Sequence, residues 1–160
     1  MIKTQIILHE SGCAQMLQEK IKASTDDLFF MLENKDDIKV NWKSVSEHMN
    51  ALPFHKYLGA LISERNISIP DVGVKALLSR SFTYQIFSGD RVPSKDIILR
   101  IALALEFSLD DTQRLLKLAD RGALYPKIKR DAVIIYCINN KPGLYKTDEM
   151  LVSLGQEPLL

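Results

Sequence analysis

The residues from Ser68 to Arg100 constrain the fold of this chain more than any other stretch. Two short helical segments lie within it, and each follows a serine, Ser68 or Ser79, whose hydroxyl can accept a hydrogen bond from the first turn of a helix. Gly89 follows the second segment, as is common where a helix ends in the left-handed conformation. A third helical segment begins after Ser94. Two short helices joined by a tight break predict a helix-turn-helix.

The apolar residues of this stretch predict how its helices pack. Val72 and Ala76 would face inward, and Gly73 interrupts the same helix, where glycine costs about 1 kcal/mol relative to alanine. We therefore expect a close approach of another helix at Gly73. In the second helix Phe82 and Ile86 are one turn apart and should form the buried side. That phase leaves four polar or aromatic residues to project outward: Arg80, Ser81, Tyr84 and Gln85.

Helical spacing predicts further helices on both sides of this stretch. The helix after Pro53 would be buried through Phe54, Tyr57, Leu58, Leu61 and Ile62, and would support the pair from outside. The helix after Ser94 is apolar on several faces and should be the central packing helix. Ser108 would begin a fifth helix. Because strand patterns are almost lacking, the fold class expected is all-α.

Two more helices are expected near the C-terminus. The first would start at Tyr125-Pro126, and its largely buried residues would be Ala132, Val133, Ile135, Tyr136 and Ile138. The second would be capped by Thr147. In residues 1–50 the sequence pattern predicts two short helices and an extended segment at 38–42, and it indicates no role for this part of the chain. The domain organisation expected is an N-terminal extension over 1–50, a helix-turn-helix unit over 51–122, and a helix pair over 123–160 that packs on it or mediates dimerisation.

Composition narrows the function classes. The chain has 160 residues, 46% apolar and 26% charged, which is ordinary for a soluble globular protein. Its two cysteines form no CxxC pair, and neither a signal peptide nor a membrane span is evident, so we expect a cytoplasmic protein without disulfides. His9 and Cys13 are four residues apart, but two ligands do not make a metal site. No hydrolase, phosphate-loop or metalloprotease motif occurs. We expect no enzyme activity, no cofactor and no metal.

Positive charge is concentrated around the predicted helix-turn-helix. Between Lys75 and Arg100 five basic residues (Lys75, Arg80, Arg91, Lys95, Arg100) stand against two acidic ones (Asp90, Asp96), so this stretch carries 5 − 2 = +3, whereas the whole chain carries +1. A local basic excess is typical of a small DNA footprint.

The run from Ser68 to Leu116 resembles the Cro/cI-type (XRE) helix-turn-helix domain, also called lambda-repressor-like. The segments that carry the resemblance are QIFSG, DRVPS and ILRIALALEFSLDDTQRLL. The chain also resembles a bacterial group of XRE-type proteins that carry YQIFSG, here residues 84–89, and a later LYP-x-x-x-RDA segment, here residues 124–132. The core match covers residues 54–119. The family usually has a small residue in the turn where this chain has Leu77, which therefore either keeps an ordinary backbone conformation or shortens the helix before it.

The resemblance implies a five-helix DNA-binding domain whose third helix, residues 79–88 with Ser79 at its start, enters the major groove. Ser68 and the loop from Gly89 to Lys95 would contact phosphate on either side. The partners implied are double-stranded DNA and a second copy of the chain, because one recognition helix contacts only a few base pairs. Half-sites would then lie about one helical turn (~34 Å) apart.

The residue types suggest roles for the exposed positions. Arg80 can bind guanine through O6 and N7 and Gln85 can bind adenine, while each could also be a solvated surface residue. Ser81 or Thr83 could contact a base or a phosphate, and Thr83 could instead face the core. Tyr84 could lie on the sugar-phosphate backbone or pack as a half-buried aromatic.

Two further basic residues, Arg91 and Lys95, could bind phosphate or belong to a solvated turn. Asp131 and its neighbour Arg130 are interpreted as a surface ion pair that contributes little to stability. The function expected from all these positions is a sequence-specific transcriptional regulator, a repressor or autoregulator. The alternative is a protein-interaction module, an adaptor or inhibitor, that retains the fold without binding DNA.

Overall fold

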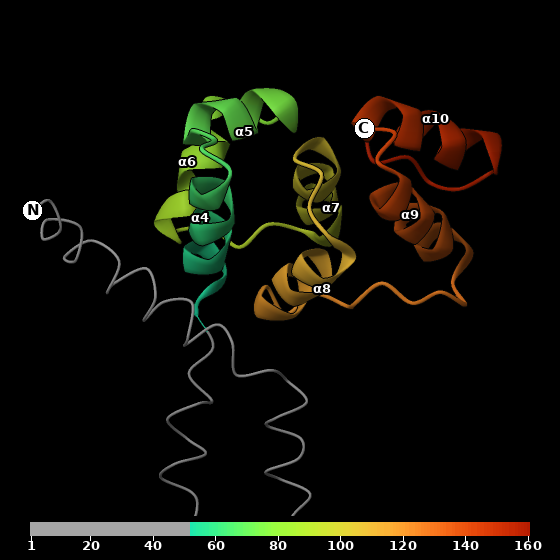
Figure 1. The fold of residues 1–160 in the computed structure, drawn as a ribbon, viewed down its shortest axis with the longest axis horizontal. Helices are drawn as coiled ribbons and strands as arrows, with labels where there is room; N and C mark the ends of the chain where they lie inside the picture. Colours follow the sequence, from blue (N-terminus) through green and yellow to red (C-terminus); the bar gives the residue numbers. More distant parts are fainter. Residues whose placement is uncertain (1–51) are drawn as a thin grey trace, which may run out of the picture. The chain divides into compact units, whose positions relative to one another are not determined.

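The computed structural model of the chain describes residues 52–160, and these residues form seven α-helices and no strand (Figure 1). The chain divides between Ala51 and Leu52 into two units, of which the second is described. The predictions made for residues 1–50 lie outside the described residues. Within residues 52–160 the all-α prediction is confirmed.

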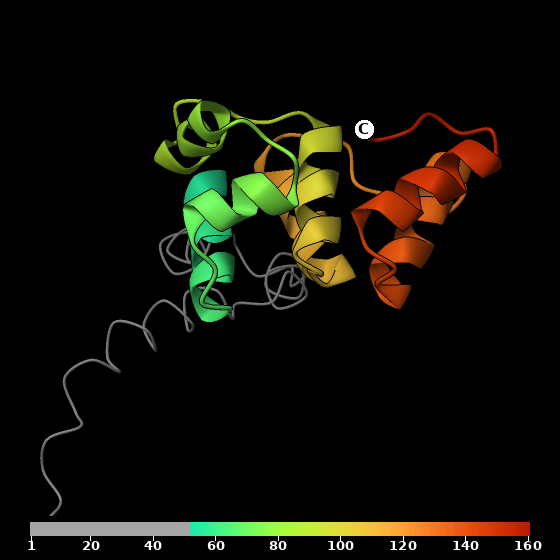
Figure 2. The ribbon, with the colours of Figure 1, turned by 90° about the horizontal axis from the view of Figure 1, so that it is seen from above.

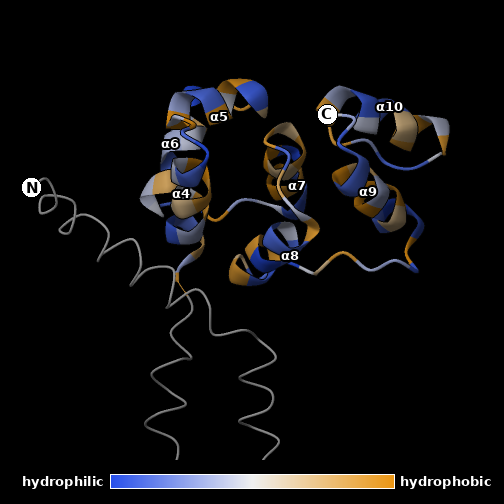
Figure 3. Ribbon diagram, in the orientation of Figure 1, coloured by the Kyte–Doolittle hydropathy of each residue, from blue (hydrophilic) through white to orange (hydrophobic). Residues whose placement is uncertain are grey.

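Most of the helices follow one another with short connections, but residues 119–128 separate α8 from α9. Their bounds are α4 Phe54–Glu64, α5 Ile69–Lys75, α6 Arg80–Ser88, α7 Lys95–Ala104, α8 Leu109–Leu118, α9 Lys129–Asn140 and α10 Leu144–Ser153. Figure 3 shows that apolar and polar residues are mixed along every helix, as expected where one side of each helix is buried and the other is exposed.

Four serines begin four of these helices, as predicted. The hydroxyl oxygens of Ser68, Ser79, Ser94 and Ser108 each accept a hydrogen bond from the backbone N–H three residues later, at 3.3, 3.3, 3.4 and 3.0 Å. Each bond satisfies a backbone donor that the helix itself leaves without a partner. The starts of α5, α6, α7 and α8 are therefore set by local sequence.

The core forms around α7, the helix expected to be central. Ile98, Leu99, Ile101, Ala102 and Leu103 are buried in it. This helix packs against α5, α8, α9 and α10. Phe107, in the break after α7, is the largest of the fully buried side chains in residues 52–160. All five apolar residues predicted for the inner side of α4 are buried as well.

A polar contact joins α4 to α8. The Tyr57 hydroxyl donates to Asp111 Oδ1 at 2.8 Å, and the same carboxylate lies 3.7 Å from the Arg65 guanidinium. Burial, together with the hydrogen bond to Asp111, raises the pKa of Tyr57 from 10.0 to about 12. The hydroxyl therefore stays protonated wherever the protein is folded near neutral pH.

Neither C-terminal helix begins where the sequence predicted: α9 begins later and α10 begins earlier. Tyr125 and Pro126 lie in the loop before α9, which begins at Lys129. Thr147 caps nothing: it is buried inside α10, where its hydroxyl donates to Gly143 O at 2.8 Å. The burial predicted for α9 is also partly wrong, because Tyr136 is 55% exposed and Cys137 is buried.

Candidate nucleic-acid interface

Helices α5 and α6 pack closely at one point. A Cβ added to Gly73 would lie 2.8 Å from Thr83 Oγ1, so no side chain fits between the two helices there. Val72 and Ala76 of α5 are fully buried. The predicted inward face of α5 and the predicted close approach at Gly73 are both confirmed.

The turn between α5 and α6 contains a leucine in a left-handed conformation. Leu77 has φ +56°. The alternative in which this residue keeps an ordinary backbone conformation is therefore wrong. Helix α5 ends early, at Lys75, and the N–H of Leu78 donates to Gly73 O at 2.8 Å. A left-handed leucine costs about 1–2 kcal/mol relative to the right-handed conformation. Other contacts must therefore stabilise this turn.

Arg100 of α7 supplies such contacts, and the sequence did not point to it. Its Nε and Nη2 donate to Ala76 O at 3.1 and 2.8 Å, and its Nη2 donates to Leu77 O at 2.5 Å. These carbonyls belong to the end of α5, where a helix leaves backbone acceptors without partners. The signal that could have revealed Arg100 is its place as the single charge in the apolar run ILRIALAL.

The buried side of α6 includes Ile86, as predicted, but Thr83 takes the place that was predicted for Phe82. Thr83 and Ile86 face the core and are 1% and 0% exposed, whereas Phe82 is only half-buried. The Thr83 hydroxyl donates to Ser79 O at 2.9 Å. Of the two alternatives for Thr83, the structure shows the core-facing one, and a contact of Thr83 with a base or phosphate is incompatible with this burial.

The outward side of α6 carries the four residues expected there. Arg80, Ser81, Tyr84 and Gln85 are all exposed. The guanidinium carbon of Arg80 lies 5.8 Å from the centre of the Tyr84 ring, and Tyr84 is 42% exposed. Figures 1 and 2 show α6 at the edge of the described unit, at the end away from α10. Within residues 52–160, no other helix covers this face of α6.

Residues on both sides of α6 complete this surface. Ser68 and Ser79 are exposed, and their hydroxyls serve as helix caps. Arg91 is exposed too, and its guanidinium lies 5.3 Å from the Phe82 ring centre. At the end of α6, Gly89 has φ +86°, which confirms the left-handed cap, and the His55 ring of α4 packs against it.

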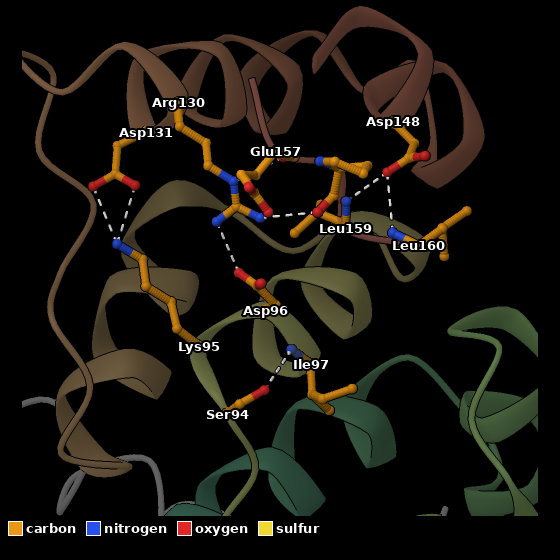
Figure 4. Close-up of polar contacts among 11 residues, drawn as sticks. Ser94, Lys95, Asp96, Ile97, Arg130, Asp131, Asp148, Glu157, Leu159 and Leu160 are labelled. Carbon is orange, nitrogen blue, oxygen red and sulfur yellow. Dashed lines mark hydrogen bonds and ion pairs between the residues drawn. The ribbon is translucent and has the colours of Figure 1, made fainter. Parts of the chain in front are cut away.

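Lys95 is engaged elsewhere. Its Nζ lies 3.0 and 3.1 Å from the two carboxylate oxygens of Asp131 in α9 (Figure 4). The side chain of Asp131 is 4% exposed and also accepts from Tyr125 N at 3.0 Å. A surface pair of Asp131 with Arg130 is therefore wrong: Arg130 binds Asp96 at 2.8 Å instead. While the pair with Asp131 holds, Lys95 belongs to the protein's own packing.

The charge that α5 and α6 present is positive but small. Lys75, Arg80 and Arg91 are exposed, and so are Asp71 and Asp90. Each of these two carboxylates accepts a hydrogen bond from a nearby serine hydroxyl, Ser68 or Ser88. The +3 of the sequence stretch is thus reduced on the surface, because Lys95 is paired and Arg100 binds backbone carbonyls.

No group of three His, Cys, Asp or Glu side chains in residues 52–160 is placed to hold a metal ion. None of the helices described has the length and apolar character to cross a membrane. Comparisons with protein-family models, with curated proteins and with solved structures found no match to this chain.

Proposed function

We propose that this protein is a sequence-specific DNA-binding regulator of the Cro/cI type, a repressor or autoregulator, and that α6 enters the major groove. The observation that carries the proposal is the division of α6 into two sides. Thr83 and Ile86 hold one side in the core, and the other side presents Arg80, Tyr84 and Gln85 to solvent. A groove-reading helix needs this division, because base edges are reached only by side chains that project from a fixed support.

The arrangement of the neighbouring helices supports the proposal. Helices α4 to α8 would be the five helices of a lambda-repressor-like domain, with α5 as the first helix of the pair and α6 as the recognition helix. The Gly73–Thr83 contact and the bonds from Arg100 to the turn fix the angle between α5 and α6. A recognition helix whose support is fixed pays little ordering entropy when it binds.

The exposed side chains have chemistry that fits base recognition. The Arg80 guanidinium can donate two hydrogen bonds to guanine O6 and N7, and the Gln85 amide can bind adenine N6 and N7. Ser81 can donate to a base or a phosphate. The contact of Arg80 with the Tyr84 ring restricts the guanidinium before DNA arrives.

Phosphate contacts would come from fewer residues than the sequence suggested. Arg91 and Lys75 are exposed cations beside α6, and Ser68 places the start of α5 at the surface. Lys95 is left out, because Asp131 already occupies its ammonium group. With two cations on phosphate per protomer, the logarithm of the binding constant should fall with log salt at a slope near −2, or about −4 for a dimer.

A mobility-shift experiment with the full-length chain tests the proposal. The probes are the DNA upstream of its own gene and a scrambled duplex of equal length, between 50 and 200 mM salt. The proposal expects tighter binding to the upstream DNA at every salt concentration and a log–log slope of at least the size given above. Equal affinity for the two duplexes would contradict sequence recognition, and the absence of a shift at 50 mM salt would contradict DNA binding.

A specific observation also favours the alternative, a protein-interaction module. Val74, Val92 and Leu77 around α6 are 75%, 51% and 43% exposed, and apolar side chains near a charged surface are typical of protein interfaces. If the alternative holds, the same experiment gives no shift, and Val74→Asp and Leu77→Asp weaken binding of a partner protein that co-purifies with the chain.

A further inference from the structure

Residues 119–128, which we call the α8–α9 loop, form the longest connection between the described helices, and side-chain bonds fix its shape. Gln113 of α8 holds the backbone of Leu124 from both sides: its Nε2 donates to Leu124 O, and its Oε1 accepts from Leu124 N, both at 2.8 Å. The Leu124 side chain is buried. The next N–H, that of Tyr125, donates to the buried carboxylate of Asp131 at 3.0 Å. The loop therefore presents its outer residues from a fixed support.

The α8–α9 loop lies against the connection from α6 to α7. Arg121 Nε donates to Pro93 O at 3.1 Å, which joins the two connections directly. Lys95, just after Pro93, binds Asp131, just after the loop (Figure 4). In Figure 2 the connection from α6 to α7 and the first part of the α8–α9 loop lie at the same edge of the described unit as α6. The surface proposed to contact DNA thus continues onto this loop.

The outer residues of the loop are basic, aromatic and aliphatic. Tyr125 and Ile128 are 52% and 53% exposed. Lys127 and Lys129, the first residue of α9, are exposed as well. Neither lysine takes part in the ion pairs found within residues 52–160. Both ammonium groups are therefore accessible to an anionic partner.

The stability of α9 does not explain where these two lysines lie. The start of a helix carries a partial positive charge, so cations there are unfavourable. Arg130, which follows them, is compensated by Asp96 at 2.8 Å. Lys127 and Lys129 have no such compensation within the described residues. A bound anion would supply it.

The surface of α6 alone is poor in positive charge. Its exposed charged residues are three basic ones and two acidic ones, which give 3 − 2 = +1: Lys75, Arg80, Arg91, Asp71 and Asp90. Residues 119–129 have three basic residues and one acidic residue, which give 3 − 1 = +2: Arg121, Lys127, Lys129 and Asp120. Because neutralised phosphates supply much of the affinity for DNA, the loop offers charge that the α6 surface lacks.

We propose that Lys127 and Lys129 bind backbone phosphates of DNA that flank the base pairs read by α6, on the side of the connection from α6 to α7. Tyr125, which is exposed beside them, lies on the sugar-phosphate backbone. This inference rests on the proposed function and adds a second phosphate-binding surface to it. An acidic protein could match the same charge, but the contact with Pro93 places the loop where a duplex that passes α6 would continue.

The added contacts change the salt dependence of binding. The slope of about −2 per protomer counts Lys75 and Arg91 alone. On a duplex that extends well past the site, Lys127 and Lys129 should add about −0.9 each, so that the slope approaches −4 per protomer. On a duplex that ends at the base pairs read by α6, it should return to about −2.

Neutral variants of the full-length chain test the proposal on the DNA upstream of its own gene and on the scrambled duplex. Lys127→Gln and Lys129→Gln should each lower the salt slope by about 1 per protomer and weaken binding to both duplexes roughly five- to tenfold at 100 mM salt. The double variant K127Q/K129Q should keep the preference for the upstream DNA. In hydroxyl-radical footprints it should lose protection at the outer ends of the site and retain it at the centre.

Lys141→Gln is the matched control. Lys141 is exposed and lies at the other end of α9, 12 residues or about 18 Å from Lys129. The control should bind both duplexes like the natural chain, with the same slope. Equal urea midpoints for all variants would verify that the fold is retained, as expected for exposed lysines.

Each alternative result overturns the proposal in a recognisable way. If K127Q/K129Q has the slope and footprint of the natural chain, the loop does not touch DNA, although the proposed function stands. A loss confined to the upstream DNA would mean base recognition, and an equal loss in Lys141→Gln would mean an effect of net charge. If the natural chain shifts neither duplex, the proposed function fails and this inference fails with it.

Discussion

Thr83 Oγ1 occupies the space that a side chain at residue 73 would need: a Cβ on Gly73 would lie 2.8 Å from it. The hydroxyl is also held from its own side, because it donates to Ser79 O at 2.9 Å. The two helices of the pair can approach this closely only because one has glycine and the other has a small, internally bonded side chain at the crossing. This contact fixes the position of α6.

Gly73→Ala should therefore destabilise the protein although alanine favours helix. The clash with Thr83 Oγ1 requires a shift of α6 or a break of the Thr83–Ser79 bond, which typically costs about 1–3 kcal/mol and exceeds the gain of about 1 kcal/mol in helix propensity. Urea unfolding measures the change.

Gly59→Ala is the matched control for this substitution. Gly59 also lies inside a helix, α4, but nothing lies within 4 Å of its Cβ position. Alanine there should stabilise by up to about 1 kcal/mol. If both substitutions stabilise, α5 and α6 are not in tight contact at Gly73.

These contacts show what the sequence could and could not reveal. The four serine caps and the inward face of α5 were predictable because they depend on residues three or four apart. Thr147 followed the same local rule and was misassigned, because a threonine can also bond the carbonyl four residues back inside a helix. The Lys95–Asp131 pair joins residues 36 apart, and no local pattern reports it. The burial of Thr83 in place of Phe82 has a related reason, because it depends on packing against Gly73 in another helix.

Replacing the two members of that ion pair should have unequal effects. Lys95→Met leaves the buried carboxylate of Asp131 with the Tyr125 amide alone, and we expect a loss of about 1–3 kcal/mol, less than for a fully buried pair because Lys95 is 29% exposed. Asp131→Asn keeps an acceptor for the amide and leaves a lysine that can turn to solvent, so about 1 kcal/mol is expected. Urea midpoints at pH 7 check both. Equal losses would mean that burial of the carboxylate is unimportant.

The stability of the protein should fall in alkaline solution through Tyr57. Its pKa is about 12 in the folded protein, compared with 10.0 for a tyrosine in an unfolded, solvated chain. Between these values the folded state retains a proton that the unfolded state has lost, so unfolding becomes more favourable as the pH rises. The contribution is complete below pH 10 and is lost as the pH rises toward 12.

Tyr57→Phe isolates this effect from the titration of other groups. The variant lacks the hydroxyl that donates to Asp111, so it should be less stable than the natural chain at pH 8. That difference should shrink in urea titrations between pH 10 and 12, because only the natural chain has this titrating hydroxyl. A difference that stays constant over the whole range would contradict the raised pKa.

The residues of the candidate interface should separate into two groups by their effect on DNA binding. Arg80→Ala should weaken binding to the preferred duplex by about 1–3 kcal/mol and binding to the scrambled duplex much less, because it removes a base contact. Arg91→Ala should weaken both duplexes alike and lower the salt slope by about 1 per protomer. Lys95→Met should leave the slope unchanged, since Asp131 already pairs with this lysine. Lys117→Ala, an exposed lysine of α8, is the control that should change neither quantity.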